Sequence, residues 1–442
     1  MSDTTLYLLA TLAKSVIVIG ALLTAFAYLT LIERRVIAFM QSRLGPNRVG
    51  PFGLLQPLAD GLKMIFKEHI IPSKARVLVY LIAPSISVVV ALSAFAVVPL
   101  GGHWLGDGKP SPWDPFIADI NVGLLYIFAI SSLAVYGIVL GGWASGNKYS
   151  LLGSLRSAAQ MVSYEVSLGL AIMGVLMFSG SLSMLDIVRG QVSLGLPYIF
   201  AQPLGFLLYC TAALAEVNRA PFDLPEAEQE LVAGYLTEFS GLRWALYQMS
   251  EYINMITVSS IAITLFLGGW TLWPVNNGTF LSWPFLWYFL KLGIALFIFI
   301  WLRATLPRIR YDQLMKVGWR ILLPLAVLNL LVTAIAVALG WPWWTTGAFG
   351  LGVILIGAGI WAVRRQRQQG EKPAVVGGQF IIPPSVKLVH IGAGASALAL
   401  NTSEDEGEEA DEAEAEADAA LAQAPKEAKA EADTASASAS KK

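Results

Sequence analysis

The residue best suited to chemistry is Glu165, a carboxylic acid within an otherwise apolar stretch of the 442-residue chain. The stretch runs from Ser157 to Phe178. If it crosses a membrane as a helix, Glu165 lies about 12 Å deep at about 1.5 Å per residue. A carboxylate is costly at that depth, and such acids usually face a bundle interior or a wet cavity, where they handle protons. The alternative is a structural acid paired with an Arg or Lys of another span.

Three more acids stand at the ends of apolar stretches, namely Glu33, Glu216 and Glu251. A charged residue at a helix end commonly lies in water or among lipid headgroups, and this is the simpler interpretation of each acid alone. Taken singly, these three residues do not indicate a site.

A further group of acids lies beside a proline turn, in the connection EVNRAPFDLPEAEQELVAGYLTEFSG. The group consists of Asp223, Glu226, Glu228 and Glu230. Asp223 and Glu226, which accompany two prolines, have the spacing of a helix N-cap and its capping box. Glu226 and Glu230 would be neighbours on one helical face, which usually marks a solvated surface. The density of acids beside the proline turn is the one observation that points instead to a functional loop.

Arginines gather around the segment RLGPNRVGPFG and after the seventh apolar stretch. They are Arg34, Arg35, Arg43, Arg48, Arg303, Arg308 and Arg310. One interpretation is that they orient the chain and hold anionic lipid headgroups. The other is that some of them line a pocket for the polar head of a ligand and restrain neighbouring acids electrostatically. The glycines and prolines of the segment predict a shaped loop rather than a helix.

The elements that must position these residues are membrane helices. The chain is 56% hydrophobic and 14% charged, against about 45–50% and about 25% in soluble domains. Nine stretches are long and apolar enough to cross a bilayer. They run approximately over 6–32, 77–100, 120–143, 157–178, 195–215, 252–273, 284–302, 321–339 and 343–363. We therefore expect an all-α fold, a polytopic helical bundle of about nine transmembrane helices. An amphipathic helix over 54–66 should lie along the interface.

Positive charge is distributed unevenly between the two sides of the expected bundle. The connections that follow spans 2, 4, 6 and 8 hold only Lys109 and Arg189, which places the N-terminus outside and the C-terminus in the cytoplasm. We expect a membrane core over 1–340, a ninth helix over 341–365, a cytoplasmic linker over 366–400 and a tail over 401–442. The tail holds 13 of the 31 acids and almost no large apolar residue, so it should be disordered.

Several kinds of site are excluded by what the sequence lacks. One cysteine, Cys210, and three histidines cannot supply a Cys/His zinc site or ligate an iron–sulfur cluster. No phosphate-binding loop and no dinucleotide fingerprint is present. We therefore expect no metal and no cofactor in this chain, and any redox centre should lie in a partner.

Four long segments resemble the quinone-chamber membrane subunit of bacterial NADH-quinone oxidoreductase, respiratory complex I. They read ERRVIAFMQSRLGPNRVGPFGLLQPLADGLKMIFKE, GGWASGNKYSLLGSLRSAAQMVSYE, AEVNRAPFDLPEAEQELVAGYLTEFSG and RATLPRIRYDQLMKVGWRILLPLAVLN. Together they cover every long cytoplasmic connection, in the order of the family. The resemblance extends from the first span through the eighth and implies a tilted bundle of eight spans, sometimes nine.

The resemblance implies a multi-pass subunit of the proton-translocating enzyme in the bacterial inner membrane. It would form the membrane side of a chamber for the substrate quinone, docked under hydrophilic-arm partners that hold flavin and iron–sulfur clusters and connected to antiporter-like membrane partners. The residues implied in quinone binding are Arg34, Arg35, Arg43, Arg48, Phe52, Asp60 and Arg303. Those implied in proton coupling are Glu33, Glu165, Glu216, Asp223, Glu226, Glu228, Glu230 and Glu251.

The sequence departs from the family in one respect, because the third span has no acid between Asn121 and Trp143. Any step of a proton path that a family carboxylate would supply there is missing. Two other functions compete with the quinone enzyme: a homologous membrane subunit of a hydrogenase or formate hydrogenlyase, and a stand-alone ion or solute transporter that uses Glu165 as its carrier group.

Overall fold

The computed structural model describes residues 3–102, 111, 113–223, 233–272 and 283–370, together with four short strands. The chain divides into two compact units, Met1–Leu355 and Ile356–Lys442. The tail over 401–442 lies outside the described residues, and so do the loop acids Glu226, Glu228 and Glu230.

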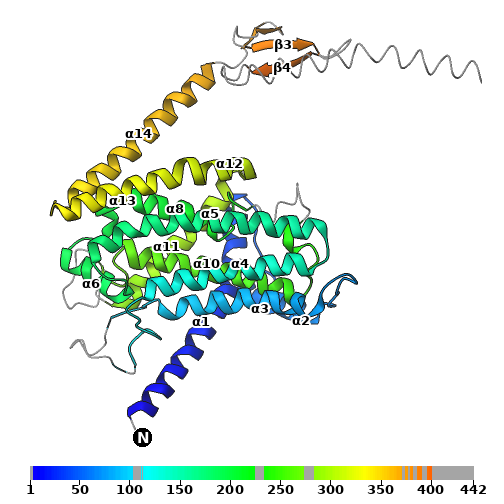
Figure 1. Cartoon of the computed structure of the whole chain (residues 1–442). Helices are drawn as coiled ribbons and strands as arrows, with labels where there is room; N and C mark the ends of the chain where they lie inside the picture. Colours follow the sequence, from blue (N-terminus) through cyan, green and yellow to red (C-terminus); the bar gives the residue numbers. More distant parts are fainter. Residues whose placement is uncertain are drawn as a thin grey trace, which may run out of the picture. The chain divides into compact units, whose positions relative to one another are not determined.

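The first unit is a bundle of helices (Figure 1), and the last of them, α14, continues in sequence into the second unit. The helices are α1 (Asp3–Met40), α2 (Gln56–Phe66), α3 (Val77–Ala94), α4 (Gly123–Ala144), α5 (Lys148–Ser179), α6 (Met184–Leu194), α7 (Tyr198–Ala201), α8 (Pro203–Glu216), α10 (Leu242–Phe266), α11 (Pro284–Thr305), α12 (Tyr311–Lys316), α13 (Leu323–Ala338) and α14 (Trp343–Gly370), with 3-10 turns at Pro51–Gly53, Phe95–Val97 and Gly234–Leu236 and a π-helical turn at Val317–Leu322. Eight helical segments of the described part are long and apolar enough to span a membrane. The predicted all-α membrane bundle is confirmed.

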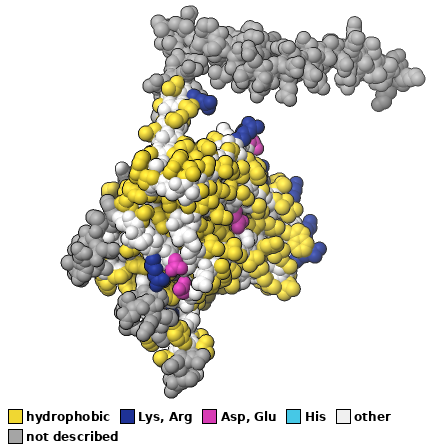
Figure 2. All heavy atoms as spheres, turned by 60° about the vertical axis from the view of Figure 1, so that its left-hand side comes forward, with side chains coloured by type: hydrophobic (Ala, Val, Ile, Leu, Met, Phe, Trp, Pro, Cys, Tyr) yellow, Lys and Arg dark blue, Asp and Glu magenta, His cyan; other side chains and the backbone are white. Residues whose placement is uncertain are grey.

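The outside of the bundle is apolar, and Figure 2 shows hydrophobic side chains over much of the visible face. On α1, for example, Leu8, Leu12 and Ile17 are each about two-thirds exposed, at 69%, 66% and 68%. Such a surface is unfavourable in water but is solvated by lipid hydrocarbon. Within a bilayer each helix also satisfies its own backbone hydrogen bonds, which is why helices carry the chain across.

The structure differs from the prediction at the fifth span, which is not one continuous helix. α7 ends at Ala201 and α8 begins at Pro203, while Gln202 between them has φ −132° and ψ 56°. Proline lacks an N–H group and clashes with the preceding turn, so it favours a break. The carbonyl of Ala201 accepts a hydrogen bond from the Thr346 hydroxyl at 2.9 Å, and the side chain of Gln202 beside it accepts one from the Asn329 amide at 2.9 Å. A break of this kind is tolerated where protein covers it.

The fourth predicted span is longer than expected. α5 begins at Lys148 rather than at Ser157, because the Asn147 side chain caps it by accepting a hydrogen bond from the Tyr149 N–H at 3.0 Å. It ends where Gly180 takes the left-handed conformation, with φ 66°, a common helix stop. Glu165 therefore lies near the middle of a long membrane helix.

α4 and α5 approach each other closely at Gly142. A Cβ atom at this position would collide with the side chain of Ser154 and lie 2.7 Å from the carbonyl oxygen of Ser150. Small residues allow membrane helices to pack at short range, where dispersion and weak polar contacts hold them together.

We expect Gly142→Ala to destabilise the bundle by about 1–3 kcal/mol, the usual cost of inserting a methyl group into a filled interface. Gly169→Ala on α5 is the matched control, because a Cβ there meets no atom within 4 Å and alanine is the better helix former. Thermal unfolding of the purified complex measures both. A Gly142 variant as stable as the Gly169 variant would show that this contact is not close-packed.

The second unit contains two antiparallel ribbons. β1 (Ala374–Val376) pairs with β2 (Gln379–Ile381), and β3 (Val386–His390) pairs with β4 (Ser396–Leu400). The segment expected as a linker over 366–400 therefore includes the last turn of α14 and four short strands.

Candidate functional site

A buried carboxylate, Glu33 of α1, pairs with two arginines from other parts of the bundle. Glu33 is only 4% exposed. Nη1 of Arg303, on α11, donates a hydrogen bond to Oε1 of Glu33. Nη1 of Arg219, which follows α8, lies 3.6 Å from the same oxygen. Since a buried charge is kept only when it is paired, this cluster joins three segments at the end of the first span.

Arg219 is itself buried and stacks on an aromatic ring. Its guanidinium carbon lies 4.1 Å from the ring centroid of Tyr252, a geometry that favours the cation. Burial alone lowers the pKa of Arg219, but the interactions with Tyr252, Glu33 and Glu251 outweigh it and leave the pKa above its ordinary value. The structure thus places a permanent positive charge close enough to two of the predicted acids, Glu33 and Glu251, to act on both electrostatically.

Asp223 begins the acidic loop and is anchored by the segment that follows α11. Its carboxylate is buried and accepts a hydrogen bond from Nη2 of Arg308 at 2.9 Å. The backbone N–H of Ile309 donates to the carbonyl of Pro221 at 3.1 Å. The predicted capping partner, Glu226, lies outside the described residues.

The far end of the same loop is anchored on α10. The hydroxyl of Tyr235 donates to Oε1 of Glu251 at 3.1 Å. Gly234, with φ 53°, passes so close to α5 that a Cβ on Gly153 would lie 2.7 Å from its Cα. The first end of the acidic loop is therefore bonded to the segment after α11, and the second end is bonded to α10 and packed against α5.

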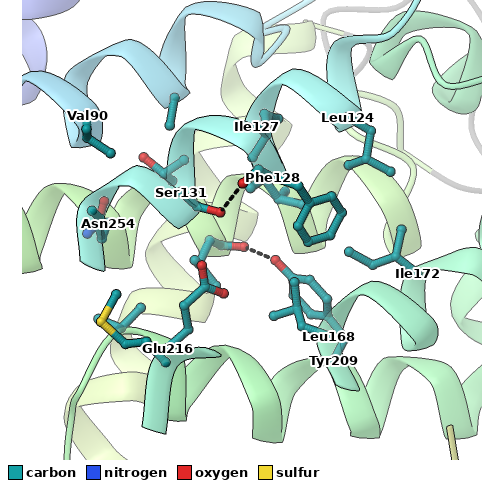
Figure 3. A pocket seen from close by; sticks show the side chains of 17 residues that line it. Val90, Leu124, Ile127, Phe128, Ser131, Leu168, Ile172, Tyr209, Glu216 and Asn254 are labelled. Atoms are coloured by element: carbon teal, nitrogen blue, oxygen red, sulfur yellow. Dashed lines mark hydrogen bonds between the residues drawn. The ribbon is translucent and has the colours of Figure 1, made fainter. Parts of the chain in front are cut away.

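Glu216, the last residue of α8, faces a cavity of about 40 Å³ between α3, α4, α5, α8 and α10. Figure 3 shows its carboxylate pointing into the space between Ser131 and Tyr209. The Ser131 hydroxyl donates to the Phe128 carbonyl at 3.1 Å, and the Tyr209 hydroxyl donates to the Val258 carbonyl at 2.9 Å. Because a water molecule needs about 10–15 Å³ of such volume, the cavity has room for a few.

Glu165 lies near Glu216. It is half-buried on α5 and close enough to Glu216 for the two carboxylates to repel each other electrostatically. Two carboxylates in such proximity disfavour double ionisation, a common arrangement in proton-handling sites. The structure thus brings together the intramembrane acid and one of the acids at helix ends.

Three of the predicted arginines line an open hollow of about 560 Å³ at the glycine and proline loop, namely Arg34, Arg43 and Arg48. Nη1 of Arg34 also lies 2.7 Å from a carboxylate oxygen of Asp60 on α2, and the Gln56 amide donates to the other oxygen at 3.1 Å. The predicted helix after the first span is confirmed, and α2 buries none of its residues. Its apolar face is therefore exposed, as an interfacial helix requires.

The remaining two predicted residues shape the loop. Arg35 donates a hydrogen bond to the carbonyl of Phe52. Phe52 has φ 52°, a left-handed backbone conformation that is unusual for a residue other than glycine. Phe52 is also 84% exposed. The ring is thus presented outward rather than packed into this chain.

Sequence reasoning missed Arg219 and Tyr252 as site residues, and it left Arg308 outside the quinone-binding and proton-coupling sets. One signal was available, because Arg219 follows Glu216 by three residues where an apolar segment ends. The tyrosine gave no signal. Within the described residues, no three His, Cys, Asp or Glu side chains are grouped to hold a metal ion.

Comparison with known proteins assigns this arrangement to a family. The family model described as NADH dehydrogenase matches residues 13–334. The chain is 55% identical to NADH-quinone oxidoreductase subunit 8 of Thermus thermophilus over 331 residues, which are 74% of this chain and 87% of that protein. It is 51% identical to an NADH-quinone oxidoreductase subunit of Deinococcus deserti over 358 residues, 79% and 90% of the two chains. It is 54% identical to an NADH-quinone oxidoreductase subunit of Thermomicrobium roseum over 327 residues, which are 72% of this chain and 93% of that protein.

The family match over residues 13–334 includes all the clusters described above. The expected family is confirmed, and with it a multi-pass membrane location and assembly with other subunits of an oxidoreductase complex. The chain therefore belongs to the NADH dehydrogenase family of membrane subunits of NADH-quinone oxidoreductase, respiratory complex I.

Proposed function

We propose that this subunit forms the membrane side of the quinone chamber and couples quinone reduction to proton translocation. The observation that carries the coupling role is Glu216 at an interior cavity of the bundle, with the second acid Glu165 close enough to act on it electrostatically. Acids held inside a membrane protein are costly and usually functional. The names of the relatives support electron transfer to quinone as the reaction of the whole complex.

The chamber is proposed at the first loop. The hollow lined by Arg34, Arg43 and Arg48 offers guanidinium groups to the oxygens of a quinone head. The residues Arg35, Phe52, Asp60 and Arg303 complete the proposed quinone-binding set. The exposed apolar face of α2 would meet lipid beside this hollow, which suits a ligand that arrives from the membrane.

Coupling is proposed to be electrostatic. Reduction changes the charge and the proton demand of the chamber, and Arg303 would transmit this change to Glu33 and Arg219 through the buried cluster. The acids that would respond are those of the loop and of the helix ends, namely Asp223, Glu226, Glu228, Glu230, Glu251, Glu216 and Glu165. Each step is a change of ion pairing or of protonation, and neither requires a large motion.

The remaining proposals concern which subunit of the complex holds each cofactor and which subunits this chain contacts. This chain would hold no cofactor, bind quinone as substrate and act as part of a translocase. Flavin and iron–sulfur clusters would belong to partners of the hydrophilic arm, and antiporter-like partners would receive the energy. The N-terminus would lie outside the inner membrane and the C-terminal tail in the cytoplasm.

The chamber role is tested by Asp60→Asn in the assembled complex. The ion pair of Asp60 with Arg34 is partly exposed, so its loss should change stability by at most about 1 kcal/mol. If Arg34 is positioned by Asp60 for quinone, quinone reduction should still fall by about tenfold or more, the equivalent of about 1.4 kcal/mol. Reduction of a soluble acceptor at the flavin should be unchanged.

Asp186→Asn is the control, because Asp186 also forms a partly exposed ion pair with an arginine, Arg189 on α6. It should leave both activities intact. Equal loss of both activities in Asp60→Asn would indicate failed assembly, and normal quinone reduction would remove Asp60 from the chamber.

Purification distinguishes the competing functions. A complex I subunit should copurify with flavin and iron–sulfur proteins after mild detergent extraction. A stand-alone transporter would be active alone in vesicles, and a hydrogenase subunit would copurify with hydrogenase instead. The relatives reported above, all named as subunits of NADH-quinone oxidoreductase, support the first outcome.

A further inference from the structure

A second cavity, separate from the acid cavity, lies between α8, α10 and α11. Its volume is about 190 Å³, larger than that of the cavity at Glu216. Apolar side chains from all three helices line it, among them Phe206, Ala213, Ala262, Ala295 and Leu302. An empty space of this size forfeits many dispersion contacts, so it favours an occupant.

Lys291, Tyr209 and Ser259 in the wall of this cavity already have hydrogen-bond partners, and the thiol of Cys210, which also lines it, is only a weak donor. Lys291 donates to three backbone carbonyls beyond α10, at 2.6, 3.0 and 2.7 Å. The hydroxyls of Tyr209 and Ser259 donate to backbone carbonyls at 2.9 and 2.8 Å. A bound water needs two to four polar partners, which this wall does not offer. The occupant must therefore be hydrocarbon.

The cavity is continuous with the lipid-facing surface. Ile294 and Ile298 of α11 line it and are nevertheless 54% and 43% exposed. Neighbouring side chains on the same helix, Leu290 and Phe297, are each 49% exposed. Because α11 has the length and composition of a membrane-spanning helix, the medium at this opening is the hydrocarbon of the bilayer.

We propose that this cavity binds one acyl chain of a membrane phospholipid, which enters from the side along α11. Lipid is the hydrocarbon that surrounds the opening, and the wall offers no polar recognition that a different ligand would require. This lipid site is distinct from the proposed quinone chamber and from the proposed coupling residues. It adjoins the cavity at Glu216, because Tyr209 and Val258 line both cavities. A bound acyl chain would therefore support the wall behind Glu216.

The test uses the assembled complex in phosphatidylcholine vesicles that contain a trace of phosphatidylcholine with a diazirine in the middle of one acyl chain. After illumination, mass spectrometry should find crosslinks within 206–214, 258–267 and 291–302 above the level on the exposed face of α1. Ala295→Phe fills part of the cavity, so these crosslinks should fall by about tenfold, because readmitting an acyl chain beside the new ring would cost about 1–3 kcal/mol and about 1.4 kcal/mol is tenfold. Phe297→Trp, on the exposed face of α11 outside the lining, should change nothing.

Three outcomes would overturn the proposal. The first is labelling of the cavity segments in the native chain no higher than on α1. The second is unchanged labelling in Ala295→Phe or, should that variant not assemble, in the smaller change Ala262→Leu. The third is displacement of the lipid probe by an excess of long-tailed quinone, which would assign the cavity to the quinone tail.

Discussion

Glu216→Gln is expected to abolish quinone-coupled proton translocation while the assembled complex still passes electrons from NADH to a soluble acceptor at the flavin. Glutamine keeps the shape of the side chain at the cavity shown in Figure 3 but cannot take up or release a proton. Positioned acids and bases contribute about 10²–10⁴-fold to the steps they serve. We therefore expect proton uptake driven by quinone reduction to fall by about 10²-fold or more.

The measurement is acidification of the vesicle interior by reconstituted complex, compared with NADH-to-acceptor activity in the same sample. Glu68→Gln is the control, since it removes one carboxylate from an exposed position and should leave both activities unchanged. Glu165→Gln should resemble Glu216→Gln, because the two carboxylates act on each other electrostatically. Full proton translocation by Glu216→Gln would contradict the proposal that Glu216 couples quinone reduction to proton translocation.

The second large effect is expected on stability, from Arg219→Leu. This change leaves the buried Glu33 with Arg303 as its arginine partner and removes the cation stacked on Tyr252. Breaking a buried ion pair from one side costs about 3–5 kcal/mol, since a desolvated charge loses compensation. Because Arg303 remains, we expect about 3 kcal/mol, seen as a lower unfolding temperature or as failure to assemble.

A double-mutant cycle with Glu33→Gln separates charge from packing. If the ion pair is responsible, the double variant should be less destabilised than the sum of the two single variants, because the carboxylate that Arg219 compensates is gone. Arg219→Lys keeps the charge but lacks the planar group that stacks on Tyr252, so it should be intermediate. Strict additivity in the cycle would show that Arg219 and Glu33 do not interact.

Most of the membrane architecture could be predicted because it depends on local quantities. The length of an apolar run decides whether a helix can cross the bilayer, and this criterion located α1, α3, α4, α5, α10, α11, the α12–α13 segment and α14. The cost of an acid inside such a run singled out Glu165 before any contact was known. The four long motifs then indicated the family, which the comparisons confirmed.

The fifth span shows where local reasoning failed. Pro203 interrupts the helical run, whereas Pro84 lies inside the continuous helix α3. The two prolines have the same chemistry. What differs is the surroundings, because Thr346 and Asn329, far away in sequence, supply hydrogen bonds to the backbone and side chain at the break.

By itself, the sequence determined which segments enter the membrane, which acids are too costly to be there by chance, and the family. Only the tertiary structure decided that Glu33 is shared by Arg303 and Arg219, that Asp223 is bound by Arg308, and that Glu216 faces a cavity. The physical reason is that hydropathy is a property of each residue, whereas an ion pair or a cavity depends on how helices distant in sequence are rotated and packed against one another.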